Sequence, residues 1–126
     1  MRYPRSSIRL ALWILPALVL LLLDSNGVAA KPPVLQSEHV VLENARVRVI
    51  EYRSQPNGGV CGVGEHKHPA HVTIVLAAAK DRATTAGAKA EVGDMKVGDV
   101  YWSDGDDHTD VNTGKTESRL IVVELK

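Results

Sequence analysis

The sequence of 126 residues contains no phenylalanine and a single cysteine, Cys61. One cysteine cannot form a disulfide within the chain, so a domain of this size must be held together by packing. Aromatic residues make up only 4% of the chain, so the core must be built mainly from Val, Leu, Ile and Ala. Because Val and Ile are crowded on a helix and fit the pleated surface of a strand, this composition favours β-structure.

The chain also lacks an excess of positive charge, since 15 basic residues balance 15 acidic ones. Residues 1–30 hold three of the basic residues and one of the acidic ones, so the remainder carries 12 against 14, a net charge of about −2. A nucleic-acid partner is excluded because it demands a basic face to neutralise its phosphates. The remainder has no basic amphipathic helix that would bind a membrane surface. It also has no G-x-S-x-G motif and no glycine-rich phosphate-binding loop, so nucleophilic hydrolysis has no support in the sequence.

Residues 1–30 have the layout of a secretory signal peptide. Three arginines precede an unbroken apolar run from Leu10 to Leu23, and a polar stretch with small residues then leads to a cleavage site after Ala30. The alternative is a retained membrane anchor, but the run has fourteen residues and contains Pro16, whereas a membrane span needs about 20. We therefore expect the protein to be exported, to the periplasm or beyond the cell.

After the leader, residues 31–38 are expected to form an extended arm, because Pro32 and Pro33 oppose a helix. Residues 39–126 alternate short runs of strand-forming residues with glycine-containing turns, and no apolar repeat at helical spacing lasts three turns. This pattern predicts one all-β barrel or sandwich over 39–126. The expected strands are 39–43, 46–54, 60–63, 71–79, 82–86, 89–92, 99–103, 108–112 and 118–126.

Two of these strands show which faces are buried. Arg46 and Arg48 alternate with Val47 and Val49, which predicts a strand with the arginines on its wet face. In 71–79 both alternating sets are mostly apolar, which is typical of a central strand buried on both sides.

Three of the five histidines lie within the stretch from Gly64 to His71. Side chains two apart on a strand point the same way, with backbones about 6.5 Å apart, so His66 and His68 can bind one ion. Lys67 then points away. An isolated pair of this kind is more often a polar solvated loop, and the metal interpretation therefore depends on residues from elsewhere in the chain.

Such residues follow in a second stretch. The segments "GVGEHKHPAHVTIVL" and "KVGDVYWSDGDDHTDVNTG" resemble the two sequence motifs of the cupins, which are small antiparallel jelly-roll β-barrels. By position, His66 and His68 match the first motif, whereas Gly105, His108 and Asn112 match the second. The resemblance covers roughly residues 46–125 and implies a cupin barrel that holds a divalent metal through the three histidines.

The sequence departs from the cupin pattern at the position of the usual glutamate ligand, where Val72 and Thr73 stand instead. His71 is the candidate substitute. On a regular strand it would face away from the other two histidines, but Pro69 could cause a bulge that shifts its direction. The alternative is that His71 is an orienting or surface residue.

A site of three histidines leaves the metal undecided among Fe, Mn, Ni, Zn and Cu. Two function classes follow: a metal-dependent oxygenase or isomerase that acts on a small acid or a sugar-like molecule, or a non-catalytic barrel that binds a metal or small ligand. A barrel without metal is the third alternative, given the missing glutamate. A homodimer is also allowed, because cupin barrels commonly pair through their sheets and an exposed Cys61 could link two copies.

Other residues have two interpretations each. Cys61 is either a thiolate near the metal or, more commonly, a small buried apolar residue. Carboxylates around His108 either hold its second ring nitrogen or form an acidic turn; they are Asp104, Asp106, Asp107 and Asp110. An acidic substrate would need a cation inside the barrel, and the residues to check are Arg48, Arg53 and Arg119. Tyr101 and Trp102 should face opposite sides of their strand, one in the core and one at the barrel mouth.

Overall fold

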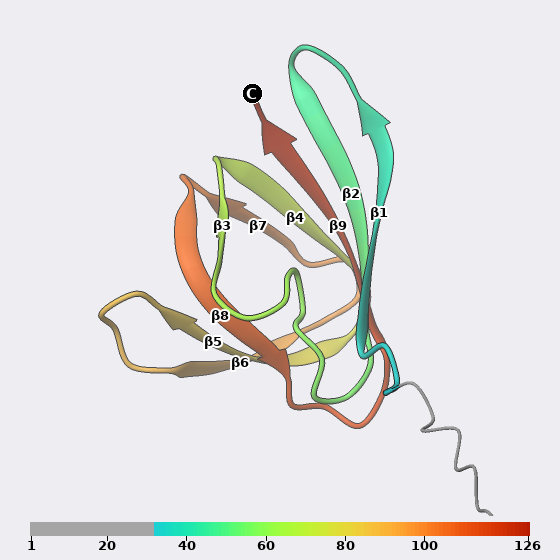
Figure 1. Ribbon diagram of the computed structural model, residues 1–126, viewed down its shortest axis with the longest axis vertical. Coiled ribbons are helices and arrows are strands. Elements are labelled where there is room, and N and C mark those ends of the chain that lie inside the picture. Colours follow the sequence, from blue (N-terminus) through green and yellow to red (C-terminus); the bar gives the residue numbers. More distant parts are fainter. Residues whose placement is uncertain (1–31) are drawn as a thin grey trace, which may run out of the picture. The chain divides into compact units, whose positions relative to one another are not determined.

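Nine β-strands and no helix make up residues 32–126, the part of the chain that the computed structural model describes (Figure 1). The signal peptide expected at 1–30 lies outside these residues. No helix long and apolar enough to cross a membrane occurs in the described part. The strands are β1 Gln36–Glu43, β2 Val47–Ser54, β3 His66–His68, β4 His71–Ala77, β5 Ala79–Thr85, β6 Glu91–Met95, β7 Val100–Ser103, β8 Asp106–Asn112 and β9 Ser118–Leu125.

The strands form two sheets that face each other across the interior (Figure 1). The larger sheet has the order β1-β2-β9-β4-β7 and the smaller one β3-β8-β5-β6, and every pairing within them is antiparallel. Strands far apart in sequence therefore lie side by side, since β9 separates β2 from β4. The prediction of an all-β antiparallel jelly-roll barrel is confirmed for the described residues.

The apolar core lies mainly on the inner face of the larger sheet. Ile50 and Tyr52 of β2 pair with Val122 and Leu120 of β9, and all four side chains are at most 4% exposed. Val75 of β4 joins them.

The predicted facing of β2 is wrong. Its buried residues are Ile50, Tyr52 and Ser54, and they lie on the same side as Arg48, whereas Val47 and Val49 occupy the other face. Arg48 can share the inner face because it lies at the end of the strand, where its guanidinium is 3.9 Å from the Glu124 carboxylate.

The expected strand at 60–63 is absent, and the chain there forms a loop. The Asp110 carboxylate accepts hydrogen bonds from the backbone N–H groups of Val60 (2.7 Å) and Cys61 (2.9 Å). These side-chain bonds satisfy donors that a strand would have paired in a ladder. The loop therefore enters the barrel instead of joining a sheet.

The expected strand at 71–79 is two strands. β4 ends at Ala77 and β5 begins at Ala79, so the chain changes sheets there, after an irregularity between Val75 and Ala77 in the pairing with β9. Leu76 is 39% exposed, so β4 is not buried on both faces as expected, although it lies between β9 and β7. β1 also begins earlier than expected, at Gln36, within the predicted arm.

Candidate metal centre

Three histidines meet where the short β3 pairs with β8. His66 lies directly opposite His108, and His68 lies opposite Asp106. Gly105 precedes β8 with φ of 106°, a conformation that other residues rarely adopt, and it makes the tight entry from β7. Spacing predicts that His66 and His68 face the same way, and the resemblance to the cupin motifs adds His108; the structure brings the three side chains together.

Each ring is held from behind through its Nδ1 atom. His66 Nδ1 lies 2.9 Å from the Gly64 carbonyl oxygen, His68 Nδ1 2.8 Å from Glu124 Oε1, and His108 Nδ1 2.9 Å from Asp106 Oδ1. Carbonyl and carboxylate oxygens only accept hydrogen bonds, so each Nδ1 carries the hydrogen, and in the neutral ring Nε2 then keeps a free lone pair. This arrangement is typical of histidines that bind a metal.

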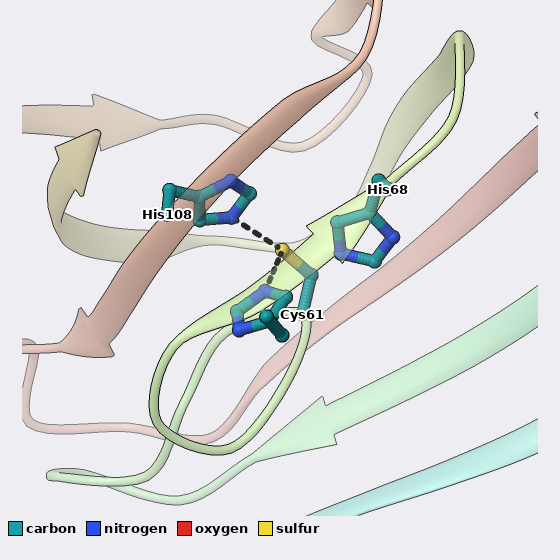
Figure 2. Close-up of side chains that lie close together, drawn as sticks. Cys61, His68 and His108 are labelled. Carbon is teal, nitrogen blue, oxygen red and sulfur yellow. Dashed lines mark hydrogen bonds between the residues drawn. The ribbon is translucent and has the colours of Figure 1, made fainter. Parts of the chain in front are cut away.

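The free nitrogens converge on a fourth donor, Cys61. One ligand atom from each of Cys61, His66, His68 and His108 lies within 4.8 Å of all the others. Figure 2 shows the Cys61 sulfur between the rings of His68 and His108, and Sγ is 3.4 Å from His108 Nε2 and 3.7 Å from His66 Nε2.

The Nε2 atom of His68 tests whether this donor set fits a metal. It is buried, and among the described residues it has no hydrogen-bond partner. A buried polar atom without a partner is costly, and a metal ion at the centre of the cluster would supply that partner. Three imidazoles and one thiol are donors that suit Zn, Fe, Ni and Cu, and the soft sulfur makes Mn less suitable.

Asp110 controls the chemistry of Cys61. The thiol donates to Asp110 Oδ2 at 2.8 Å. Burial, and then the neighbouring Asp110 charge, raise the pKa of the Cys61 thiol well above its ordinary value. Burial also opposes the charge of Asp110, but the neighbouring His108 ring and hydrogen bonds from Cys61 and Val60 outweigh it and lower the pKa of this carboxyl. In the absence of metal Cys61 is therefore a neutral thiol beside a carboxylate.

His108 lies between two carboxylates. Its Nδ1 contacts Asp106 at 2.9 Å and its Nε2 is 3.6 Å from Asp110 Oδ2. The Asp110 carboxylate beside Nε2 raises the pKa of His108, against the effect of burial, and Asp106 raises it further. The idea that a carboxylate near His108 holds its second nitrogen is correct for Asp106.

His71 lies outside the group of four donors. Its Nδ1 contacts the Pro69 carbonyl oxygen at 2.8 Å, and its ring centre is 5.1 Å from that of His68. Pro69 and Ala70 carry the chain from β3 in the smaller sheet to β4 in the larger one, so His71 approaches the cluster from the opposite sheet. Val72 and Thr73, at the position of the family glutamate, follow it on β4.

The sequence does not single out three contributors to the site. A lone cysteine such as Cys61 is more commonly a small buried apolar residue, and Asp110 is one of four carboxylates around His108. Glu124, which holds His68, lies in neither motif. Asn112 matches the second motif but is structural, since its side chain donates to the Ser54 and Thr116 carbonyl oxygens.

A pocket of about 240 Å³ adjoins the cluster and opens between the two sheets. Cys61, His108 and Asp110 line its inner end, and Tyr101 and Trp102 line it nearer the surface. These two aromatic side chains are 42% and 56% exposed, so neither belongs to the core, contrary to expectation.

None of the three candidate arginines lines this pocket. Arg48 faces inward but lies beside Glu124. Arg53 and Arg119 both pair with the Glu51 carboxylate on the other face of the sheet. The expected cation for an acidic substrate is therefore missing from the pocket lining.

No family model matches the sequence, and no curated protein matches it. Solved structures do match. A cupin domain from Bordetella pertussis Tohama I superposes with a TM-score of 0.65 at 25% identity, over 72% of this chain and 93% of that one.

Two further structures support the same fold. A conserved protein with a double-stranded β-helix domain from Klebsiella pneumoniae has a TM-score of 0.57 at 20% identity, covering 71% of this chain and 76% of that one. A polyketide cyclase from Streptomyces resistomycificus has a TM-score of 0.56 at 18% identity, covering 72% and 65%. Residues 32–126 thus have a cupin fold, with a Cys/His cluster inside it that could bind a metal.

Proposed function

We propose that this chain binds one divalent transition metal at the cluster of Cys61, His66, His68 and His108, and that the metal acts on a small molecule held in the adjoining pocket. The observation that carries the proposal is the buried Nε2 of His68, which lacks a partner at the point where the other three donors meet. When bound, the metal would polarise an oxygen of the small molecule or activate water. Oxygenase or isomerase chemistry is the reaction class that we propose.

The protein's own residues prepare the site. Glu124 and Asp106 fix two of the imidazoles, so that little reorganisation accompanies binding. Cys61 must lose its proton to become a ligand, and the carboxylate of Asp110, 2.8 Å away, is placed to accept it. Metal affinity should therefore fall as the pH is lowered.

A second function, metal retention without catalysis, is favoured by Cys61 itself. Four protein donors complete a tetrahedral shell, as in structural zinc sites, whereas catalytic sites keep one position open. If the Cys61 thiol stays with Asp110, three histidines remain and the shell is open.

We further infer that the protein acts outside the cytoplasm. The support is the order of basic, apolar and small residues in 1–30. An exported product whose N-terminal residue is Lys31 would establish cleavage after Ala30.

The first experiment measures metal content by mass spectrometry on protein purified without chelator or histidine tag. We expect about one metal per chain in the wild type and in His39→Ala, since His39 is exposed on β1, and loss of metal in His68→Ala. Equal metal in the two variants would contradict the proposal. His71→Ala should retain metal, because its ring lies outside the four donors.

Cobalt loading then separates the two functions. A thiolate-to-cobalt absorption band that Cys61→Ser abolishes would identify Cys61 as a ligand. Azide binds only where a coordination position is open, so a change in the spectrum on azide addition supports the open site, and an unchanged spectrum supports metal retention.

A further inference from the structure

The pocket beside the metal cluster contains a carboxylate that holds none of the histidines, Asp81. It lies on β5, whose side chains alternate between the interior and solvent. Ala83 pairs with Asp110 and Asp81 with Asn112, so Asp81 lies one inward position beyond the cluster along the smaller sheet. It lines the pocket together with Cys61.

The carboxylate of Asp81 is incompletely satisfied. Its Oδ1 atom is buried and lacks a hydrogen-bond partner among the described residues. Burial, followed by the charge of Asp110, raises the pKa of Asp81 to about 6. At neutral pH it is still mainly ionised, so the wall of the pocket contains a carboxylate whose buried oxygen has no donor. Such an atom is costly, and a ligand that brings an O–H or N–H group would remove the cost.

The charges of the pocket select the kind of ligand. Asp81, Asp106 and Asp110 line it, and its lining includes no lysine or arginine. A divalent metal bound beside the Cys61 thiolate would not balance the negative charge of these three carboxylates, so the pocket would remain negatively charged. An anionic ligand is therefore disfavoured, and a neutral or cationic hydrogen-bond donor is favoured.

There is also space beside Asp81 for the body of a ligand. A second hollow of about 290 Å³ shares four lining residues with the first: Asp81, Ala83, Met95 and Tyr101. Gly93 of β6 pairs directly with Asp81, and a Cβ atom added there would meet no other atom within 4 Å. The missing side chain at Gly93 thus leaves the barrel open next to the carboxylate.

We propose that Asp81 is a ligand-binding residue, which accepts a hydrogen bond from the hydroxyl or amine of a small neutral or cationic molecule whose apolar body lies against Tyr101 at the pocket rim, next to Trp102. This inference rests on the proposed function, because it names the class of molecule that the pocket holds. It replaces the small acid expected from the sequence.

The test uses the fluorescence of Trp102 in the full chain carrying Trp13→Phe, which makes Trp102 the single tryptophan. The probes share one ring and differ in head group: benzylamine, benzyl alcohol and benzoate, titrated at about pH 8, where Asp81 is ionised. We expect saturable changes with the amine and the alcohol, and at least about tenfold weaker binding of benzoate.

Variants identify the residue responsible. Asp81→Asn should weaken benzylamine binding by about tenfold or more, whereas Asp107→Asn, which removes the same charge on the other face of β8, should change it by less than about twofold. Gly93→Leu should block all probes by filling the space beside Asp81. Equal binding of benzoate and benzylamine, unchanged binding by Asp81→Asn, or no binding of any probe would overturn the inference.

Metal content is measured on the same samples, and the titrations are repeated after chelation. If the protein holds about one metal per chain but binds the probes without selectivity, this inference fails and the proposed function stands. If the protein binds benzylamine selectively but holds no metal, this inference stands and the proposed function fails.

Discussion

The inner faces of the two sheets are built from different kinds of residue. The larger sheet contributes an apolar core, in which no side chain is more than 4% exposed: Ile50, Tyr52, Val75, Leu120 and Val122. The inner face of the smaller sheet is mostly polar, and its members include His66, His68, Asp81, His108, Asp110 and Asn112. The first set gains free energy from leaving water, whereas the second must find partners to be buried at all.

This difference teaches where stability and chemistry reside. Apolar residues of the larger sheet hold the fold, and the smaller sheet carries the polar groups that are available for binding. The division has exceptions, because the larger sheet also has four buried polar residues: Ser54, His71, Ser118 and Glu124. Two of them, His71 and Glu124, lie near His68, and Glu124 bonds to it directly, so these two extend the polar cluster across the interior.

The largest effect should come from the core of the larger sheet. Leu120→Ala should lower the free energy of unfolding by about 2–5 kcal/mol, because it leaves a cavity among side chains that cannot collapse fully. Urea denaturation of the metal-free protein measures it. The matched control is Leu125→Ala on the same strand, where 41% of the side chain is already exposed and the loss should be under about 1 kcal/mol. Equal losses would show that the core lies elsewhere.

The next effect concerns the metal cluster without touching a ligand. A Cβ atom at Gly62 would lie 2.6 Å from ring atoms of His66. Gly62→Ala should displace that ring and weaken metal binding by about 10–100-fold, with little change in the unfolding of the metal-free protein. Competition with a chromophoric chelator measures the affinity, and Gly93→Ala, which has free space, serves as the control. An unaltered affinity would show that His66 is not held by this loop.

The smallest effect should be a gain. The pKa of Asp81 is raised by burial from 3.8 to about 6, so the folded state binds its proton more tightly than the unfolded state does. Its contribution therefore makes the fold less stable as the pH rises from about 4 through 6. Asp81→Asn should stabilise the metal-free protein by about 1 kcal/mol at pH 8, a figure reduced because the carboxyl retains solvent contact, and by almost nothing near pH 4.

The charged and titratable groups that face Asp81 must be considered in that measurement. They are Asp106, His108 and Asp110 on β8, Glu91 and Asp94 on β6, His71 on β4, Tyr101 on β7, and Cys61. Asp107→Asn again controls for a general change in charge. Destabilisation by Asp81→Asn at pH 8 would mean that the carboxylate supports the fold instead of awaiting a ligand.

Much of the fold was predictable because turn residues separate the β-forming runs, and three histidines were predictable because two motifs carry them. Which face of β2 is buried was not predictable. The alternation of arginine and valine does not show which of the two faces turns inward, and Glu124, which pairs with the inward Arg48, lies 76 positions later in the sequence. The loop at 60–63 could not be distinguished from a strand, because what replaces its ladder bonds is the side chain of Asp110.

The role of Cys61 depended on the same contact. A lone cysteine is usually a small buried residue, and only the position of Asp110, 49 residues away, turns its sulfur toward the histidines. The predicted link between two copies gains no support from this position, since Sγ faces the cluster, and the homodimer stays a prediction.

The position of β9 affects how the barrel forms. It follows all other strands in the sequence and yet occupies the middle of the larger sheet, between β2 and β4. Both neighbours must wait for pairings that span most of the domain, and these non-local contacts are slow to form. Because Glu124 arrives on the same strand to orient His68, the Cys/His cluster is assembled only when the sheet closes. Binding of the proposed metal would therefore require a completed fold.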